Sequence, residues 1–119
     1  MRFLVLVKAT KASEAGELPT KEMLAEMGAF NDTLRRDGIF LGGEGLKPTS
    51  QAARISFAGG KPTVTDGPFT ETKELVAGFW LLQGRSKDEI VERMSRAPFE
   101  GGELEIRPFY ELEDFKGIL

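Results

Sequence analysis

The sequence of 119 residues contains neither histidine nor cysteine. The lack of cysteine excludes disulfides, a thiol nucleophile and a thiolate metal site. The lack of histidine removes the commonest general base near neutral pH and the commonest metal ligand. Acid–base chemistry would therefore fall to carboxylates, to lysine or to the single tyrosine, Tyr110. We expect no metal site and no bound cofactor.

Long apolar runs and an excess of basic residues are also missing. The apolar run at the start, Phe3 to Val7, is shorter than the core of a signal peptide. No stretch approaches the roughly 20 apolar residues of a membrane helix. The formal net charge of −3 argues against a nucleic-acid partner, because such a partner requires a basic face. We therefore expect a cytoplasmic protein that contacts neither membranes nor nucleic acids.

A composition of 40% hydrophobic and 29% charged residues is typical of a globular chain, and the length predicts one domain over residues 1–119. Apolar residues alternate where we expect strands and recur every three or four residues where we expect helices. The expected order is a strand at 3–8, a helix from Thr20 to about Asp37, a Gly-interrupted strand within 39–48, a hairpin over 52–67, a strand at 76–83, a helix capped by Ser86 and a strand at 103–110. The first helix carries a stripe that is expected to face the core, formed by Met23, Met27, Phe30 and Leu34.

This order of elements predicts an α+β fold of the ferredoxin-like type, with an antiparallel sheet, two helices on one face and an inserted hairpin. The strands at 3–8 and 76–83 are apolar on both faces, whereas the helices can cover only one face. Soluble monomers rarely leave such a large apolar surface uncovered. We therefore expect a second copy of the chain to cover the other face, which makes the protein a homodimer.

The stretch VTDGPFTETKE, residues 64–74, is either a connection between strands or a site. Asp-Gly between strands normally forms a tight hairpin turn, but Pro68 favours an extended residue before it. A turn Asp usually accepts a hydrogen bond from the amide two residues on, and Pro68 has no N–H. The Asp66 carboxylate must then accept from the Phe69 or Thr70 amide, as a turn or cap residue, or face a pocket. Both alternatives stand.

The segments TVTDGPFTETKELVAGFW, FLGGEGLKP and LEIRPFY resemble the DGPF-motif branch of the YCII-related proteins. The resemblance implies a dimeric fold of the ferredoxin-like, dimeric α/β-barrel type. It implies little about activity, because the family is largely uncharacterised. Another branch has been proposed to be enzymatic because of a His–Asp pair in its cleft. This chain has no histidine, and only Asp66 can match that pair. Some relatives are associated with sigma factors of the extracytoplasmic-function type, which implies a regulatory role as an alternative.

Charged and aromatic residues near the DGPF motif are the candidates for chemistry. Asp66 and Glu71 are the candidate catalytic residues, because carboxylates that converge repel each other and the pKa of one then rises towards neutrality. The candidate substrate-binding residues are Glu44, Arg107 and Phe69. We expect the Arg107 guanidinium either to pair with Asp66 or Glu71 or to recognise a substrate.

Two functions follow from these observations. The first is a small enzyme or binding protein that binds or converts a small polar molecule in a carboxylate-lined cleft at the DGPF corner. The second is a non-catalytic regulatory or interaction module, associated with a sigma factor. A deep pocket with paired carboxylates would favour the first function. A flat, satisfied corner, together with exposed apolar residues beyond the dimer interface, would favour the second.

Overall fold

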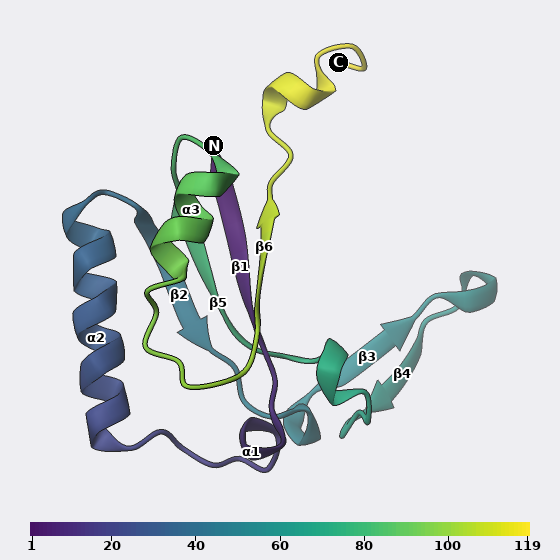
Figure 1. Ribbon diagram of the computed structural model, residues 1–119. Helices are drawn as coiled ribbons and strands as arrows, with labels where there is room; N and C mark the ends of the chain where they lie inside the picture. Colours follow the sequence, from purple (N-terminus) through teal and green to yellow (C-terminus); the bar gives the residue numbers. More distant parts are fainter.

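The computed structural model describes residues 1–119 and has a four-stranded antiparallel sheet at its centre (Figure 1). The strand order is β2-β5-β1-β6, in which β1 is Arg2–Lys8, β2 is Phe40–Gly45, β5 is Val76–Gln83 and β6 is Leu104–Pro108. Helices α2 (Lys21–Arg36) and α3 (Lys87–Met94) lie on the same face of the sheet. This arrangement confirms the expected α+β fold of the ferredoxin-like type. No helix is long and apolar enough to cross a membrane.

The helices begin and end where the sequence predicts. The Thr20 side chain accepts a hydrogen bond from the Met23 amide at the start of α2, and Gly38 takes a left-handed conformation after its end. The Ser86 side chain caps α3 by accepting from the Glu89 amide. The Glu89 carboxylate pairs with Arg85 instead of returning to the cap, so only half of a capping box forms.

A one-turn helix, α1 (Lys11–Glu14), interrupts the surface segment that follows β1. The mostly polar residues 11–18 are expected to form a surface loop, and the sequence pattern does not predict this helix. Its start is a capping box, in which the Thr10 hydroxyl accepts a hydrogen bond from the Ser13 amide and the Ser13 hydroxyl accepts one from the Thr10 amide. The helix matters for the site because it positions the side chain of Glu14.

The hydrophobic core lies between the two helices and the sheet. Its eight buried residues are Phe3, Val5, Leu34, Ile39, Trp80, Leu82, Ile90 and Met94. The Trp80 indole N–H donates to Asn31 Oδ1 at 2.8 Å, so its one polar group is satisfied. In the expected stripe of α2, Met27 and Phe30 pack against this core, but Met23 is 56% exposed. The stripe therefore reaches the core only from the second turn of the helix onwards.

The opposite face of the sheet, here called the open face, is apolar at its centre. Five side chains of β1 and β5 point away from the helices and are half-buried: Leu4, Leu6, Ala77, Phe79 and Leu81. Figure 1 shows no helix on this side. The molecule is accordingly thin, with extents of 48 × 46 × 18 Å and a radius of gyration of 16.7 Å. A compact chain of this length would have a radius of gyration of about 13.5 Å.

Two segments extend away from the body, at opposite ends of the sheet (Figure 1). The first is the hairpin, in which β3 (Ala53–Ser56) pairs only with β4 (Thr63–Asp66). The Gly59-Gly60 pair predicts a tight turn, but the two glycines, both with positive φ, lie in a six-residue connection. The second segment, here called the C-terminal arm, comprises residues 110–119 and follows β6.

Candidate functional site at the DGPF corner

The DGPF corner, residues 66–69, joins the end of β4 to the segment that leads into β5. Its backbone is held by the loop before β3. The Gly67 amide donates to the carbonyl of Ala52 at 2.9 Å. The Phe69 amide donates to Thr49 Oγ1 at 3.0 Å. The corner is therefore fixed to the rest of the chain by hydrogen bonds whose acceptors lie outside the motif.

Thr49 connects this corner to helix α1. Its amide donates to Glu14 Oε1 at 3.1 Å, and its hydroxyl donates to Glu14 Oε2 at 2.6 Å. The same hydroxyl accepts from the Phe69 amide. Sequence reasoning missed both Glu14 and Thr49, because they are 35 residues apart and belong to no local pattern. Only the tertiary fold brings them to the motif.

Gly67 is required by close packing at this corner. A Cβ atom at this position would lie 1.7 Å from the carbonyl oxygen of Thr49. No side chain fits in this space without a movement of the backbone. Gly67 therefore allows the corner to approach the loop closely enough for the Ala52 and Thr49 hydrogen bonds to form.

Asp66 and Glu71 are both exposed, and neither carboxylate forms a hydrogen bond or ion pair within the chain. Asp66 accepts from neither the Phe69 nor the Thr70 amide, because the Phe69 amide donates to Thr49 instead. The structure thus contains neither of the bonds expected of a turn or cap residue. Glu71 precedes the short 3-10 helix Thr72–Glu74, and its side chain does not cap that helix.

Phe69 is half-buried and forms a cation–π contact with Arg54 of β3. The guanidinium carbon of Arg54 lies 3.7 Å from the centre of the Phe69 ring. No carboxylate of the chain forms an ion pair with Arg54, so its N–H donors are available to a ligand. The contact of Arg54 with Phe69 depends on the path of the hairpin, so the sequence alone does not predict it.

Glu44 and Arg107 lie on the open face, at opposite margins of the sheet. Glu44, on edge strand β2, lies opposite Phe79 of β5 in the strand register. Arg107, on edge strand β6, lies opposite Leu4 of β1. The carboxylate that Arg107 contacts is Glu105, at 3.9 Å. The expected pairing of Arg107 with Asp66 or Glu71 is therefore absent within the chain, because Arg107 stands on the sheet and not beside the corner.

No group of three or more carboxylates gathers closely enough to hold a metal ion. A shallow groove of about 480 Å³ runs between α3 and β6, away from the DGPF corner. It is lined by Lys87, Val91, Met94, Ser95, Leu104 and Ile106. None of the residues expected at the site contributes to this groove. Within one chain, the candidate residues thus lie in three separate places, namely the exposed corner and the two opposite margins of the sheet.

Comparisons with known proteins agree with this fold. An uncharacterised protein of Rhizobium meliloti (strain 1021) is 41% identical over 66 residues, and the match spans 53% of each chain, about half the length of that relative. The solved structure of 5-chloro-2-hydroxyhydroquinone dehydrochlorinase from Burkholderia phenoliruptrix, in complex with 2,5-dihydroxybenzoquinone, superposes with a TM-score of 0.54. It shares 17% sequence identity, and the match covers 96% of this chain and 98% of that one, so the likeness concerns the fold. Since the model of the YCII-related domain matches residues 1–113, which include the whole of the sheet and helices described above and nearly the whole chain, the chain belongs to the YCII-related family.

Proposed function

We propose that the protein is a homodimer of the DGPF branch that binds a small polar molecule at the DGPF corner. The observation that carries the proposal is the contrast at this corner between a fixed backbone and free charged side chains. Gly67 and Phe69 are hydrogen-bonded to the body, whereas Asp66 and Glu71 are exposed and unpaired. Groups held in place without partners of their own are suited to binding a ligand.

The ligand class follows from the chemistry of these groups. Asp66 and Glu71 can accept hydrogen bonds from hydroxyl or amino groups, and Arg54 can donate to a carbonyl or carboxylate. The Phe69 ring offers an apolar surface between these polar groups. A small molecule with several hydroxyl or carbonyl groups fits this set. The bound quinone of the dehydrochlorinase supports the choice, because a similar fold there binds a small oxygenated ring.

The homodimer is supported by the open face. Its five half-buried apolar side chains lie on the two central strands and have no helix above them. A second copy would bury this surface and bring the margins that carry Glu44 and Arg107 to the interface. In the proposed dimer these two residues extend the site from the interface side. Asp66 and Glu71 would transfer protons only if the ligand or the second copy draws them together. The proposal includes the cytoplasmic location expected from the sequence.

The test combines a ligand screen with one substitution. Saturation-transfer NMR against hydroxylated aromatics and hydroxy acids identifies a ligand, and calorimetry then compares wild type with Asp66→Asn. We expect Asp66→Asn to weaken binding about tenfold or more, because a hydrogen bond to a charged group contributes roughly 1.5–3 kcal/mol. Glu26→Gln, at an exposed position on helix α2, is the matched control and should bind as wild type. Equal binding by all three proteins would refute a site at the corner.

A second candidate is the regulatory or interaction module, with a sigma factor of the extracytoplasmic-function type as partner. It is favoured by the large apolar side chains exposed on the hairpin and on the C-terminal arm: Ile55, Phe57, Val64, Tyr110, Leu112, Ile118 and Leu119. Size-exclusion chromatography of the protein with such a sigma factor tests it. This candidate requires a stable complex that Ile55→Glu abolishes, and two separate peaks at micromolar concentration would count against it.

A further inference from the structure

We propose that the hairpin of each protomer docks its apolar face on the C-terminal arm of a second copy of the chain. The inference rests on the homodimer of the proposed function and adds to it a specific contact. It is carried by three observations, namely the two-sided pattern of the hairpin, the isolation of both segments within the protomer, and their opposite charges.

The hairpin has one apolar and one polar face. In its register Ile55 lies opposite Val64, and Arg54 lies opposite Thr65. Side chains alternate across a strand, so Ala53, Ile55 and Val64 share one face, with Asp66 at its base, and Arg54 lies on the other face. This pattern is typical of antiparallel strands that are covered on one side. In the protomer, however, Ile55 is 56% and Val64 is 63% exposed. The hairpin thus has the residue pattern of a covered face, but no other segment of the same chain covers it.

The hairpin is nevertheless held at its base. The Gly67 and Phe69 amides are bonded to Ala52 and Thr49, and the Arg54 side chain lies over the Phe69 ring. A two-stranded hairpin is at best marginally stable in water when nothing packs against it. The contacts at the DGPF corner orient the hairpin relative to the sheet, and a partner surface is still needed to stabilise its apolar face.

The C-terminal arm has a similar character. Its base is attached to the sheet by an ion pair of 3.0 Å between Arg2 and Glu111. After Glu111, the backbone hydrogen bonds that its amides donate all end on carbonyls of the arm itself. Tyr110, Leu112 and Ile118 are exposed, although all three are large and apolar over most of their surface. The arm thus provides a second uncovered apolar surface.

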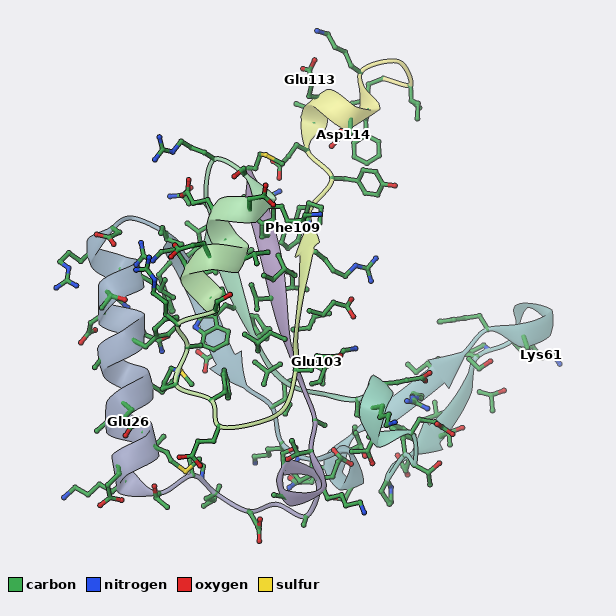
Figure 2. All side chains as sticks on the ribbon, viewed as in Figure 1. Glu26, Lys61, Glu103, Phe109, Glu113 and Asp114 are labelled. Carbon is green, nitrogen blue, oxygen red and sulfur yellow. The ribbon has the colours of Figure 1, made fainter.

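Charge favours contact between a hairpin and an arm over contact between two like segments. Residues 53–66 have a formal charge of +1, from Arg54 and Lys61 against Asp66. Asp66 lies at the base of the Ile55 face and Arg54 on the opposite face, so the basic residue that can meet the arm is Lys61, beyond the ends of the strands. Residues 110–119 have a formal charge of −2, because three acidic residues outnumber Lys116. Figure 2 shows Lys61 at the far end of the hairpin, and Glu113 and Asp114 on the arm. Complementary charges steer association and disfavour the like-charged alternatives.

Symmetry explains why the occupant is a second copy. The hairpin and the arm leave the same protomer at opposite ends of the sheet, so they do not meet within one chain (Figure 1). In a two-fold dimer, any contact from the hairpin of one protomer to the arm of its partner is repeated in reverse. One symmetry operation then covers both hairpins and both arms. A foreign partner would have to supply a separate surface for each segment.

Cross-linking tests the contact cleanly, because the chain has no cysteine of its own. Two differently tagged chains, Ile55→Cys and Leu112→Cys, are co-expressed, purified through both tags and treated with a short bismaleimide. We expect a band at twice the 13.1 kDa of the single chain. The matched control pairs Ser56→Cys with Leu112→Cys, which places the thiol on the polar face of the same hairpin. Its band should be at least fivefold weaker.

The outcomes separate the two proposals. A dimer in sedimentation equilibrium with no excess of the Ile55–Leu112 band over the control would overturn the docking contact and leave the homodimer standing. A stronger band between two Ile55→Cys chains would also overturn it, in favour of hairpin against hairpin. A species of only 13.1 kDa would overturn both proposals. If Ile55→Cys fails to fold, Val64→Cys probes the same face of the opposite strand.

Discussion

The two faces of the sheet are built from alternate residues of the same strands, yet they have different surroundings. On β1, Phe3 and Val5 are buried under the helices, whereas Leu4 and Leu6 on the open face are half-buried. Both sets are apolar, so the difference does not lie in the polarity of the strand residues. It lies in what covers each face. The chain itself covers the helix side, whereas no helix covers the open face, which is the surface that the proposed second copy would bury.

The largest expected effect is on the helix side. Trp80→Ala removes a buried aromatic side chain, together with its hydrogen bond to Asn31. The loss of free energy of unfolding should be about 3–5 kcal/mol, as for other large-to-small substitutions in a core. Urea titration measures this loss. Leu18→Ala, at a highly exposed position, is the control and should change stability by less than about 0.5 kcal/mol. A similar loss in both variants would contradict the assignment of Trp80 to the core.

The open face should respond through assembly instead of folding. Leu6→Glu places a charge at the centre of the proposed interface, where an unpaired buried charge costs about 3–5 kcal/mol. The dimer should therefore dissociate at least about 100-fold more readily, while the monomer keeps its fold. Sedimentation equilibrium and circular dichroism measure the two properties. Leu24→Glu, at an exposed position on helix α2, should leave the dimer unchanged. An unfolded Leu6→Glu monomer would show instead that the face contributes to the protomer itself.

A smaller effect is expected at the corner. Gly67→Ala introduces a Cβ that would lie 1.7 Å from the Thr49 oxygen, so the backbone must shift and the Ala52 hydrogen bond is strained. We expect a loss of about 1–3 kcal/mol, the range for overpacked sites. Gly45→Ala is the control, because nothing lies within 4 Å of the Cβ it would add. If thermal unfolding shifts equally for the two variants, close packing at Gly67 is not the reason for the glycine.

The body of the fold could be predicted from the sequence because its signals are local. The strand Val76–Gln83 and the caps at Thr20 and Ser86 were all predicted to within a residue or two, since alternation and capping depend on neighbouring residues. Helix α1 was missed because its single turn buries no residue and so leaves no periodic pattern. The one exposed residue of the α2 stripe, Met23, shows that periodicity identifies a face without showing how far the packing extends.

The candidate site was less predictable, because it depends on contacts between distant segments. The reasoning that Pro68 denies Asp66 its usual partner agrees with the structure, in which the Asp66 carboxylate is unpaired. The group that satisfies the Phe69 amide, Thr49, could not be inferred from the motif. The ion pair expected of Arg107 with Asp66 or Glu71 does not form within the chain, because Arg107 lies on β6, two residues from Glu105 on the same face of the strand. The alternative role of Arg107 in substrate recognition stays a prediction. The roles of Asp66 and Glu71 as catalytic residues stay predictions.

The smallest expected effect is that of Asp66→Asn on stability. Its comparison with Thr49→Val separates the residue that holds the corner from the residue offered to a ligand. Thr49→Val keeps the shape of the side chain but removes the hydroxyl that accepts from Phe69 and donates to Glu14. Because these partners are partly buried, the variant should lose about 1–3 kcal/mol of stability. Asp66→Asn should change stability by less than about 0.5 kcal/mol, because its carboxylate is exposed and unpaired. Urea titration of both variants at one pH decides the matter. A larger loss for Asp66→Asn than for Thr49→Val would mean that Asp66 stabilises the corner, and its assignment to a ligand site would then have to be given up.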